Sequence, residues 1–340
     1  MKISTIGIDL AKSVFQVHGV DAAGQVVVRR KLRRAEVLKF FEALPPCRVG
    51  MEACATSHFW AREISALGHD VRLMPPSYVK AYLRRQKNDA ADAEAICEAV
   101  TRPSMRFVPV KSAEQQSVLV LHRTRDLLVR QRTMLINAIR GHCGEFGIIA
   151  PQGARRSAEL TEQLSNAPAP VFPDLARSAL LMLADQLDAL AVQIHALDRQ
   201  LMIWHRQNEA SQRLATIPGV GIITATALAA SVPEPGLFRS GREFAAFLGL
   251  VPRQNSSGGK DRLGRISKMG DGYLRKLLVV GATSVIRRAA VNASATGVWV
   301  RSLMTRKPSR LVTVAMANKT ARIAWAVLTR GEVYRAPVIV

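Results

Sequence analysis

Residues 3–32 read ISTIGIDLAKSVFQVHGVDAAGQVVVRRKL, and this stretch decides the fold class. Apolar and polar residues alternate over 3–8, and the runs 14–20 and 26–31 are rich in the β-branched side chains that favour strands. The Ala-Ala-Gly sequence at 22–24 is a turn signal between the last two runs. We therefore predict a meander of three strands at the start of the chain.

Helical and strand patterns then alternate up to about residue 110. The predicted elements are a helix at 35–44, a strand at 48–53, a helix at 58–67, a strand at 71–74, a helix at 89–101 and a last strand at 106–110. Three strands followed by alternating helices and strands is the order of the ribonuclease H-like fold. We predict an α/β domain of this RuvC-like class over residues 1–110.

Two long helical segments follow this domain. The segment 112–146 repeats leucine every seven residues, and in the segment 174–206 apolar residues alternate spacings of three and four, as in a coiled coil. The apolar positions of the second segment are Leu180, Leu183, Leu187, Leu190, Ile194, Leu197, Leu201 and Trp204. This pattern fits a coiled coil between subunits and a hairpin with the first segment equally well, and the two can coexist.

A length of 340 residues suits two or three domains. The patterns divide the chain into the N-terminal domain, a helical linker at 111–208 and a mostly α-helical C-terminal domain at 209–340. Four prolines between residues 151 and 173 predict a loop inside the linker, and the Gly-, Ser- and Arg-rich stretch 252–270 predicts a second loop.

Basic residues dominate the charge. The 48 Lys and Arg outnumber the 26 Asp and Glu, which gives a net charge of +22. Residues 241–340 alone hold 18 basic and 4 acidic residues, a net +14. An enzyme of small acidic metabolites rarely needs this excess, whereas a nucleic-acid-binding protein gains affinity from each phosphate that it neutralises. The last third of the chain is therefore the predicted polyanion-binding surface.

The cysteines and apolar segments predict a cytoplasmic protein. The four cysteines at 47, 54, 97 and 143 form no Cys-x-x-Cys pair and no zinc-type spacing, so we expect reduced thiols. The N-terminus lacks the long apolar core of a signal peptide, and we find no apolar run long enough to span a membrane. We expect no membrane partner and a nucleoid-associated location in the cytoplasm.

Four acidic residues are candidate ligands of Mg²⁺ or Mn²⁺. Asp9 lies on the first predicted strand, Glu52 ends the fourth, and Asp89 and Asp92 share one face of a predicted helix. Strands one and four are central in a ribonuclease H-like sheet, so the four carboxylates can converge. Their mutual repulsion favours a hard divalent cation, which suits phosphoryl transfer. Alternatively, Asp89 is only a helix N-cap and Asp92 only a solvated charge.

Residues 218–221, Pro-Gly-Val-Gly, lie between two predicted helices and resemble a helix-hairpin-helix turn. Gly219 and Gly221 would let the backbone come close to a phosphate, beside the free N–H groups of the second helix. A purely structural turn explains the same residues.

A Gly- and Ser-rich stretch from 249 to 275 contains the third group of candidate functional residues. Serines 256 and 257 precede Gly258 and Gly259 on pliant backbone. The basic residues around them, which could bind a phosphate, are Arg253, Lys260, Arg262, Lys268 and Arg275. A serine in this setting could act as a nucleophile, or the loop could hold phosphates without reacting.

The acidic set, the Pro-Gly-Val-Gly turn and the serine stretch together resemble the IS110 family of insertion-sequence transposases, including its IS1111 group. The resemblance extends from Gly7 to about Arg330. It implies a RuvC-like Asp-Glu-Asp-Asp domain and a C-terminal transposase domain that supplies a catalytic serine. Carried over, the acids are Asp9, Glu52, Asp89 and Asp92, and the serine is Ser257, with Ser256 as the alternative.

The resemblance also implies partners: double-stranded donor and target DNA, a structured guide RNA, and further copies of the chain in a dimer or tetramer. The second long helix separates the acids from the serine in sequence, so we expect the acidic site of one subunit to complete the serine site of another. Three alternatives remain open. They are a RuvC-like nuclease or junction resolvase without a covalent intermediate, a sugar-kinase or chaperone ATPase of the actin-like class, and a nucleic-acid-binding protein without activity.

Overall fold

The computed structural model describes residues 2–82, 88–149, 153, 159, 161–162, 164, 171–260, 262–291 and 293–336. The chain forms two compact units, Met1–Gln116 and Ser117–Val340, which we describe separately. The helical linker and the C-terminal helices therefore belong to one unit, and their division into two domains stays a prediction. The predicted loop at 151–173 lies mostly outside the described residues.

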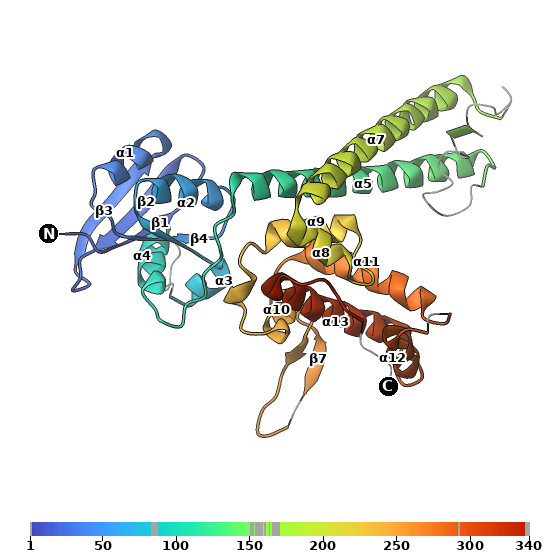
Figure 1. The fold of residues 1–340 in the computed structure, drawn as a ribbon. Coiled ribbons are helices and arrows are strands. Elements are labelled where there is room, and N and C mark those ends of the chain that lie inside the picture. Colours follow the sequence, from blue (N-terminus) through green and yellow to red (C-terminus); the bar gives the residue numbers. More distant parts are fainter. Residues whose placement is uncertain are drawn as a thin grey trace. The chain divides into compact units, whose positions relative to one another are not determined.

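A five-stranded sheet forms the centre of the first unit (Figure 1). Its strands are β1 (Thr5–Asp9), β2 (Val14–Val20), β3 (Val26–Arg33), β4 (Arg48–Glu52) and β5 (Asp70–Met74). The order across the sheet is β3-β2-β1-β4-β5. The first three strands are antiparallel neighbours, whereas β4 pairs parallel with both β1 and β5. The predicted meander and the central position of strands one and four are confirmed.

Helices cover both faces of this sheet. The described helices of four or more residues are α1 (Val37–Glu42), α2 (Ser57–Ala66), α3 (Pro76–Val79) and α4 (Asp89–Val100). Side chains of α1 and α2, including Phe41 and Trp60, share one apolar cluster with Ile6 and Ile8 of β1. Because successive strand residues point to opposite faces, Gly7 and Asp9 lie on the other face, beneath α4.

Residues 106–110 do not form the predicted strand. Val108 makes only an isolated bridge with Leu73 of β5, in which the Val108 N–H donates to the Leu73 carbonyl at 2.7 Å. Thr101–Pro103 ends α4 in turns, and the segment after it lacks the alternation that a longer edge strand needs. The α/β class is as predicted, and so is the order of the other elements except for the short helix α3, which was not predicted. The RuvC-like classification stays a proposal.

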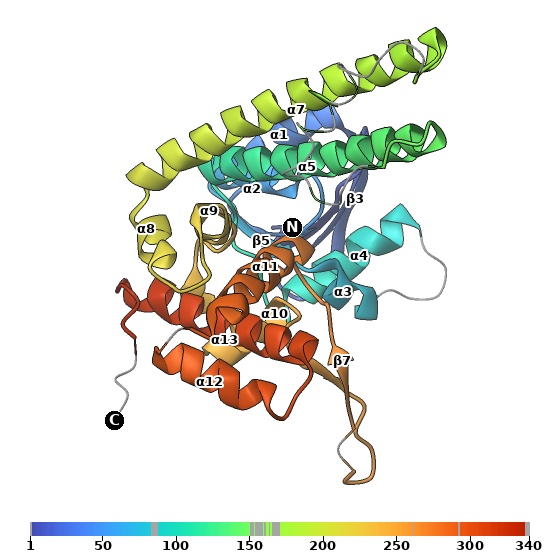
Figure 2. The ribbon, with the colours of Figure 1, turned by 90° about the vertical axis from the view of Figure 1, so that its right-hand side faces the viewer.

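The two long helices α5 (Ala113–Glu145) and α7 (Asp174–Gln207) lie side by side (Figures 1 and 2). Ile136, Ile139 and Leu187 share a buried cluster between them, and Arg125 of α5 forms an ion pair with Asp198 of α7. The intrachain hairpin is therefore present. A coiled coil between subunits stays a prediction.

Helix α7 is, by length and composition alone, apolar enough to cross a membrane, a candidate segment that was not predicted from the sequence. Only 22% of the apolar window is buried inside the structure. Its apolar side chains pack in part on α5, and its Asp198 pairs with an arginine. One such helix is weak evidence for a membrane span, and we assign α7 to the helical pair.

The remaining helices pack around a second apolar core. They are α8 (Glu209–Ala215), α9 (Ile222–Ser231), α10 (Gly241–Phe247), α11 (Gly272–Arg288), α12 (Ala295–Met304) and α13 (Ser309–Arg330). The core includes Leu228, Phe244, Leu278 and Met316, each at most 2% exposed. The mostly helical C-terminal region is confirmed.

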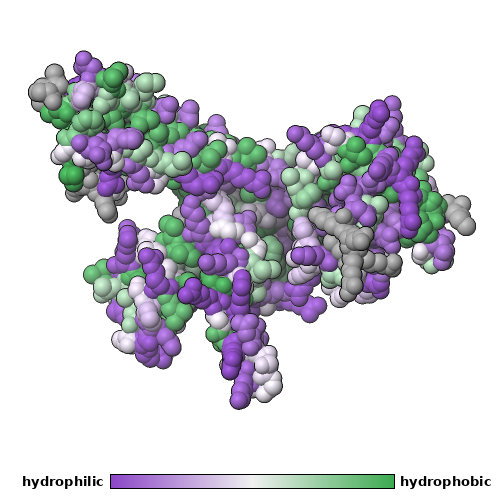
Figure 3. Space-filling view, turned by 180° about the vertical axis from the view of Figure 1, so that it is seen from behind, coloured by the Kyte–Doolittle hydropathy of each residue, from purple (hydrophilic) through white to green (hydrophobic). Residues whose placement is uncertain are grey.

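Residues 252–270 are not simply a loop. β6 (Pro252–Gln254) and β7 (Leu263–Ile266) form an antiparallel hairpin that projects from the helices as a largely hydrophilic arm (Figure 3). The prediction failed because the strands are short and exposed, so they carry no buried face and no apolar alternation.

Candidate active site

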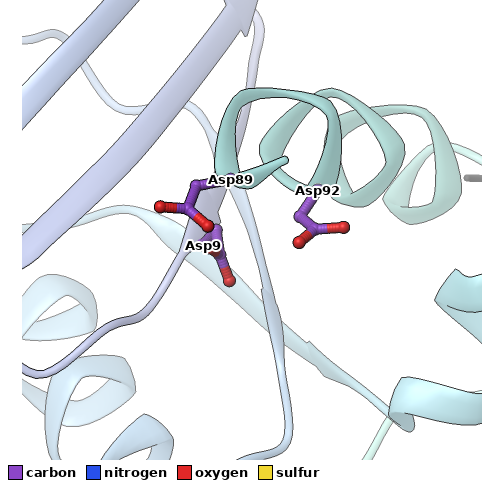
Figure 4. Close-up of side chains that lie close together, drawn as sticks. All are labelled: Asp9, Asp89 and Asp92. Atoms are coloured by element: carbon purple, nitrogen blue, oxygen red, sulfur yellow. The ribbon is translucent and has the colours of Figure 1, made fainter. Parts of the chain in front are cut away.

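Asp9, Asp89 and Asp92 lie close together where β1 ends and α4 begins (Figure 4). One carboxylate oxygen from each lies within 4.8 Å of those of the other two. Asp9 ends β1, and both other aspartates lie in the first turn of α4. Asn88, not Asp89, is the N-cap of this helix, because its side chain accepts a hydrogen bond from the Ala91 N–H at 2.8 Å. The capping alternative for Asp89 is therefore wrong.

Two glycines allow this convergence. A Cβ on Gly7 would overlap the Ala93 carbonyl oxygen and the Cys97 backbone of α4. A Cβ on Gly50 of β4 would lie 2.8 Å from the Val100 Cβ, closer than side chains normally approach. Since both central strands present only backbone here, α4 packs directly on the sheet. The start of α4, with its aspartates, is thereby held beside the end of β1.

Glu52 ends β4 on the same face as Asp9 but is not part of the three-carboxylate group. The parallel register pairs Ile8 with Met51, so the next step along both strands brings Asp9 and Glu52 level. The pKa of the nearby Cys54 thiol is raised, first by burial and then by the negative charges of Glu52 and Asp9. Glu52 therefore borders the cluster without joining it as closely as the three aspartates.

The three aspartates fit a hard divalent cation. All their donor atoms are oxygens, which is the ligand type that Mg²⁺ prefers. Two oxygens on opposite sides of one Mg²⁺ lie about 4.2 Å apart, so small side-chain rotations would bring all three carboxylates onto one ion. Three anions this close repel one another strongly without a cation, which favours binding.

The two candidate serines lie near the tip of the β6–β7 hairpin and make different contacts there. The Ser256 hydroxyl accepts hydrogen bonds from the Arg262 N–H at 3.2 Å and the Gln254 side chain at 3.1 Å, and so holds the hairpin together. Ser257 is exposed, and its hydroxyl makes no hydrogen bond within the described part of the chain. Its carbonyl accepts from the Lys260 N–H across the turn. Gly258 and Gly259, at φ 55° and 75°, make this turn possible.

The basic residues of this region divide into two groups. Lys260, Arg262 and Lys268 are exposed on or beside the hairpin, as a phosphate-binding role requires. Arg275 instead donates from one guanidinium nitrogen to the carbonyls of Leu248 and Met269, both at 2.8 Å. Arg275 thereby joins the two ends of the hairpin segment. The sequence pattern did not predict this structural role.

Arg253 shares this second role in part, because its guanidinium donates to the Ser267 carbonyl at 3.2 Å across the base of the hairpin. Close glycine contacts fix the same base: Gly249 packs on the Met269 backbone and Gly270 on the Phe247 carbonyl. The hairpin is therefore exposed at its tip and anchored at its base.

The Pro-Gly-Val-Gly turn joins α8 and α9. Gly219 has φ 84°, and an added Cβ would lie 2.8 Å from Val285 and 2.9 Å from the Gly281 carbonyl of α11. This close approach serves packing on α11, so Gly219 has a structural reason to be glycine. Gly221 is exposed and is the N-cap of α9. Phosphate binding at this turn stays a prediction.

A buried polar network joins α5, α9 and α11, and it was not predicted. His122 of α5 is 1% exposed, and its two ring nitrogens lie 3.0 Å from the Tyr273 hydroxyl of α11 and 3.0 Å from the Thr226 hydroxyl of α9. Burial lowers the pKa of His122 to about 4, the nearby Arg125 charge adding to this effect, and burial raises that of Tyr273 to about 12. A single histidine in a long helix gives no sequence signal for such a network.

Comparison with known proteins identifies the class of this chain. Residues 6–146 match the DEDD transposase family of IS110 type, and residues 211–296 match the family described as transposase IS116/IS110/IS902. A probable family 20 transposase of Pseudomonas aeruginosa is 52% identical over 98% of this chain and 99% of its own length. The chain belongs to the IS110 transposase family. The resemblance inferred from its motifs is confirmed.

Two further relatives of this transposase agree. The transposase for insertion sequence element IS1328 of Yersinia enterocolitica is 42% identical, with 98% of each chain covered. The transposase for element IS1111A of Coxiella burnetii is 40% identical over 98% of this chain and 92% of its own length. The protein is thus a DNA transposase, which excludes the actin-like kinase or ATPase alternative. Its carboxylate cluster matches the divalent-metal-dependent acidic site that the DEDD family suggests.

Proposed function

We propose that this transposase exchanges DNA strands through a phosphoserine intermediate at Ser257, supported by a metal site at Asp9, Glu52, Asp89 and Asp92. The observation that carries the proposal is the different use of the two serines. Both serines are exposed, but the Ser256 hydroxyl is bonded into the hairpin, whereas the Ser257 hydroxyl makes no hydrogen bond within the described part of the chain and lies beside glycines in a turn that also carries Lys260. An accessible hydroxyl among cations is what attack on a phosphodiester requires.

The covalent steps balance without an energy source. The Ser257 Oγ attacks phosphorus, the bond between phosphorus and one DNA oxygen breaks, and the serine proton ends on that departing oxygen. A hydroxyl of a second DNA strand then attacks the phosphoserine, and the Ser257 Oγ recovers a proton. One phosphodiester replaces another, so the strands are rejoined in a new order. Lys260 and Arg262, near the tip, would neutralise the phosphate during both attacks, and Arg253 and Lys268, at the base of the hairpin, would hold neighbouring phosphates.

The aspartates would hold Mg²⁺ or Mn²⁺, with Glu52 at the border of the site. A divalent cation supplies Lewis-acid polarisation of a phosphate oxygen. The protein's own contribution is to hold Asp9, Asp89 and Asp92 together before any ion binds. This preorganisation comes from the direct packing of α4 on Gly7 and Gly50.

Trapping the covalent intermediate tests this proposal. The purified protein is incubated with donor and target DNA and Mg²⁺, denatured and digested, and the peptides are searched for a nucleotide attached to residues 252–265. We expect the adduct on Ser257, its loss in Ser257→Ala, and its retention in Ser256→Ala. Cleaved DNA with no adduct in any sample would overturn the proposal.

A metal-dependent nuclease or junction resolvase is the second candidate. The observation that favours it is that three carboxylates converge within the first unit alone, without any residue of the hairpin. Such an enzyme would hydrolyse DNA in the Ser257→Ala variant at the wild-type rate. Ser257-independent products with free hydroxyl and phosphate ends would establish this alternative.

We also propose a structured guide RNA and a homo-oligomer of two or four subunits. Support for the RNA comes from the family resemblance and the net charge of +14 in residues 241–340. Sequencing the nucleic acid that survives high-salt purification tests it: one discrete RNA from the element's flank is expected, and random cellular RNA would contradict the proposal. Site sharing between subunits predicts that mixing Asp9→Ala with Ser257→Ala protein restores activity, whereas mixtures as inactive as either parent would exclude sharing.

A further inference from the structure

One face of α13 carries apolar and basic side chains but no acidic ones. The residues Leu311, Val314, Ala315, Asn318, Lys319, Arg322, Ile323 and Ala326 recur at spacings of three and four, so they form a stripe along one side of the helix. This stripe is the floor of a groove of about 1130 Å³. The walls come from the start of α10, Trp299 of α12 and the base of the β6–β7 hairpin.

The chemistry of this groove is cationic and aromatic. Four basic side chains line it: Arg242, Arg265, Lys319 and Arg322. Trp299 and Trp325 also line it, and none of the described lining residues is acidic. Cations that follow a phosphate backbone, combined with aromatic rings on which bases stack, are the features by which proteins hold unpaired nucleic-acid strands. The volume exceeds that of most small-molecule pockets.

The aromatic walls are fixed in place before any ligand binds. The Trp325 indole N–H donates to the Pro235 carbonyl at 3.1 Å, and the Lys319 ammonium lies 4.3 Å from the centre of a Trp299 ring. Asn318 donates to the Leu250 carbonyl at 3.1 Å, which ties α13 to the segment that leads into the hairpin. Trp325 and Asn318 therefore lose little side-chain freedom on binding, which favours affinity.

The charges of the groove are not balanced within it. Burial lowers the pKa of Lys319, and the neighbouring Arg322 charge lowers it further. An anion placed between these two side chains would relieve their repulsion. A phosphate group is the anion that accompanies stacking bases.

The hairpin connects this groove to the candidate nucleophile. Arg265 and Ile266 of β7 line the groove, while Ser257 lies at the tip of the same hairpin. Pro252 also lines the groove, and five residues of extended chain span at most about 17 Å. A DNA strand with its phosphate at Ser257 would therefore reach the groove within about five steps of 3.4 Å. A guide RNA is not cut at the serine and has no such constraint.

We propose that this groove between α10, α12, α13 and the hairpin base holds an unpaired segment of the DNA strand that Ser257 cuts, with phosphates on Arg265 and Arg322 and a base on Trp299 or Trp325. The assignment of the strand rests on the proposed role of Ser257. The groove would fix the strand a few nucleotides from the cut and so position its phosphate at the hairpin tip.

Binding of a labelled single-stranded oligodeoxynucleotide tests the proposed phosphate contacts of Arg265 and Arg322. Arg322→Gln and Arg265→Gln should each raise Kd about 3- to 10-fold and lower the slope of log K against log salt by about 0.7, the value for one lost phosphate contact. Arg310→Gln is the matched control, because Arg310 is equally exposed on α13 but does not line the groove. Equal Kd values for all four proteins would overturn the proposal.

Photocrosslinking locates the strand. DNA with 5-iodouracil at single positions up to ten nucleotides from the cut is irradiated with Ser257→Ala protein, and the attached peptide is identified by mass spectrometry. We expect attachment at Trp299 or Trp325 from positions within about five nucleotides of the cut. Attachment elsewhere, or attachment in the groove only with RNA of the same sequence, would overturn the proposal.

The two proposals fail separately. Groove crosslinks in a protein that never forms a phosphoserine would remove Ser257 from the mechanism and leave a strand-binding groove. A trapped Ser257 adduct with no groove crosslinks would keep Ser257 in the mechanism and show that the groove does not hold the DNA strand.

Discussion

The acidic cluster and the serine hairpin differ in how rigidly their side chains are supported. The aspartates stand on a sheet and a helix that are packed so closely that glycine is required at the contact. Ser257 stands on a two-stranded arm whose strands are exposed and whose turn depends on two left-handed glycines. The proposed metal ligands must be held at fixed distances, whereas the proposed nucleophile, which would change DNA partners, benefits from a pliant support.

The difference extends to what anchors each site. The acids are positioned by apolar packing beneath them, through Ile6, Ile8 and Met51 on one face and α4 on the other. The hairpin is positioned by polar contacts at its base, made by Arg253, Arg275 and close glycine backbones. We therefore expect substitutions at the hairpin tip to change the rate of strand exchange. Substitutions beneath the acidic cluster should instead change the distances between its carboxylates and so its affinity for a metal ion.

The largest effect is expected at the hairpin tip. Ser257→Ala should lower strand exchange by at least about 10³-fold, because in the proposed mechanism the ester forms on the Ser257 hydroxyl. Ser256→Ala should lower it only about 10-fold, because the Arg262 N–H and the Gln254 side chain lose an acceptor and the hairpin loosens. Single-turnover adduct formation measures both. If Ser256→Ala were the more damaging change, the assignment of the two serines would be reversed.

The acidic cluster could be predicted from the sequence better than the hairpin, because the two sites stand on different kinds of support. Asp9, Asp89 and Asp92 were found from strand alternation and helical spacing, because their supporting elements are buried and strongly patterned. The hairpin was predicted as a loop, because β6 and β7 are short, exposed and without apolar alternation. The bonds that distinguish Ser256 from Ser257 depend on the register of the strands, which spacing does not give.

Other features depend on contacts between distant segments. Gly219 reads as part of a phosphate-binding turn, yet its nearest neighbours are Gly281 and Val285 of α11. The structural bonds of Arg275 and the partners of His122 also join residues far apart in the chain. Periodicity identifies elements and faces, but it does not identify which faces meet.

The next effect tests the close packing under the acidic cluster. Gly7→Ala should displace α4, because the new Cβ overlaps the Ala93 carbonyl oxygen, and should weaken Mn²⁺ binding about 10- to 100-fold. Gly19→Ala on β2 is the matched control, since its Cβ would meet Ile6 at an ordinary 3.4 Å. Isothermal titration with Mn²⁺ measures the two affinities. Unchanged affinity in Gly7→Ala would mean that the cluster does not depend on this packing.

The smallest effect concerns the buried polar network of His122, Tyr273 and Thr226. His122 has a pKa of about 4 when folded and about 6.5 when unfolded, so the unfolded chain binds a proton that the folded chain rejects. Stability from this residue is complete above pH 6.5 and falls as the pH drops towards 4. Between pH 7 and pH 5 we expect a loss of about 2 kcal/mol of unfolding free energy.

Urea denaturation of the whole protein at pH 7 and pH 5 measures this loss. His122→Gln should lower the unfolding free energy at pH 7, because Tyr273 and Thr226 lose their ring partner, but it should remove the part of the pH dependence that comes from this histidine. His195→Gln, at an exposed position on α7, is the control and should keep the wild-type pH dependence. A pH dependence of the same size in His122→Gln would show that the histidine is not held neutral.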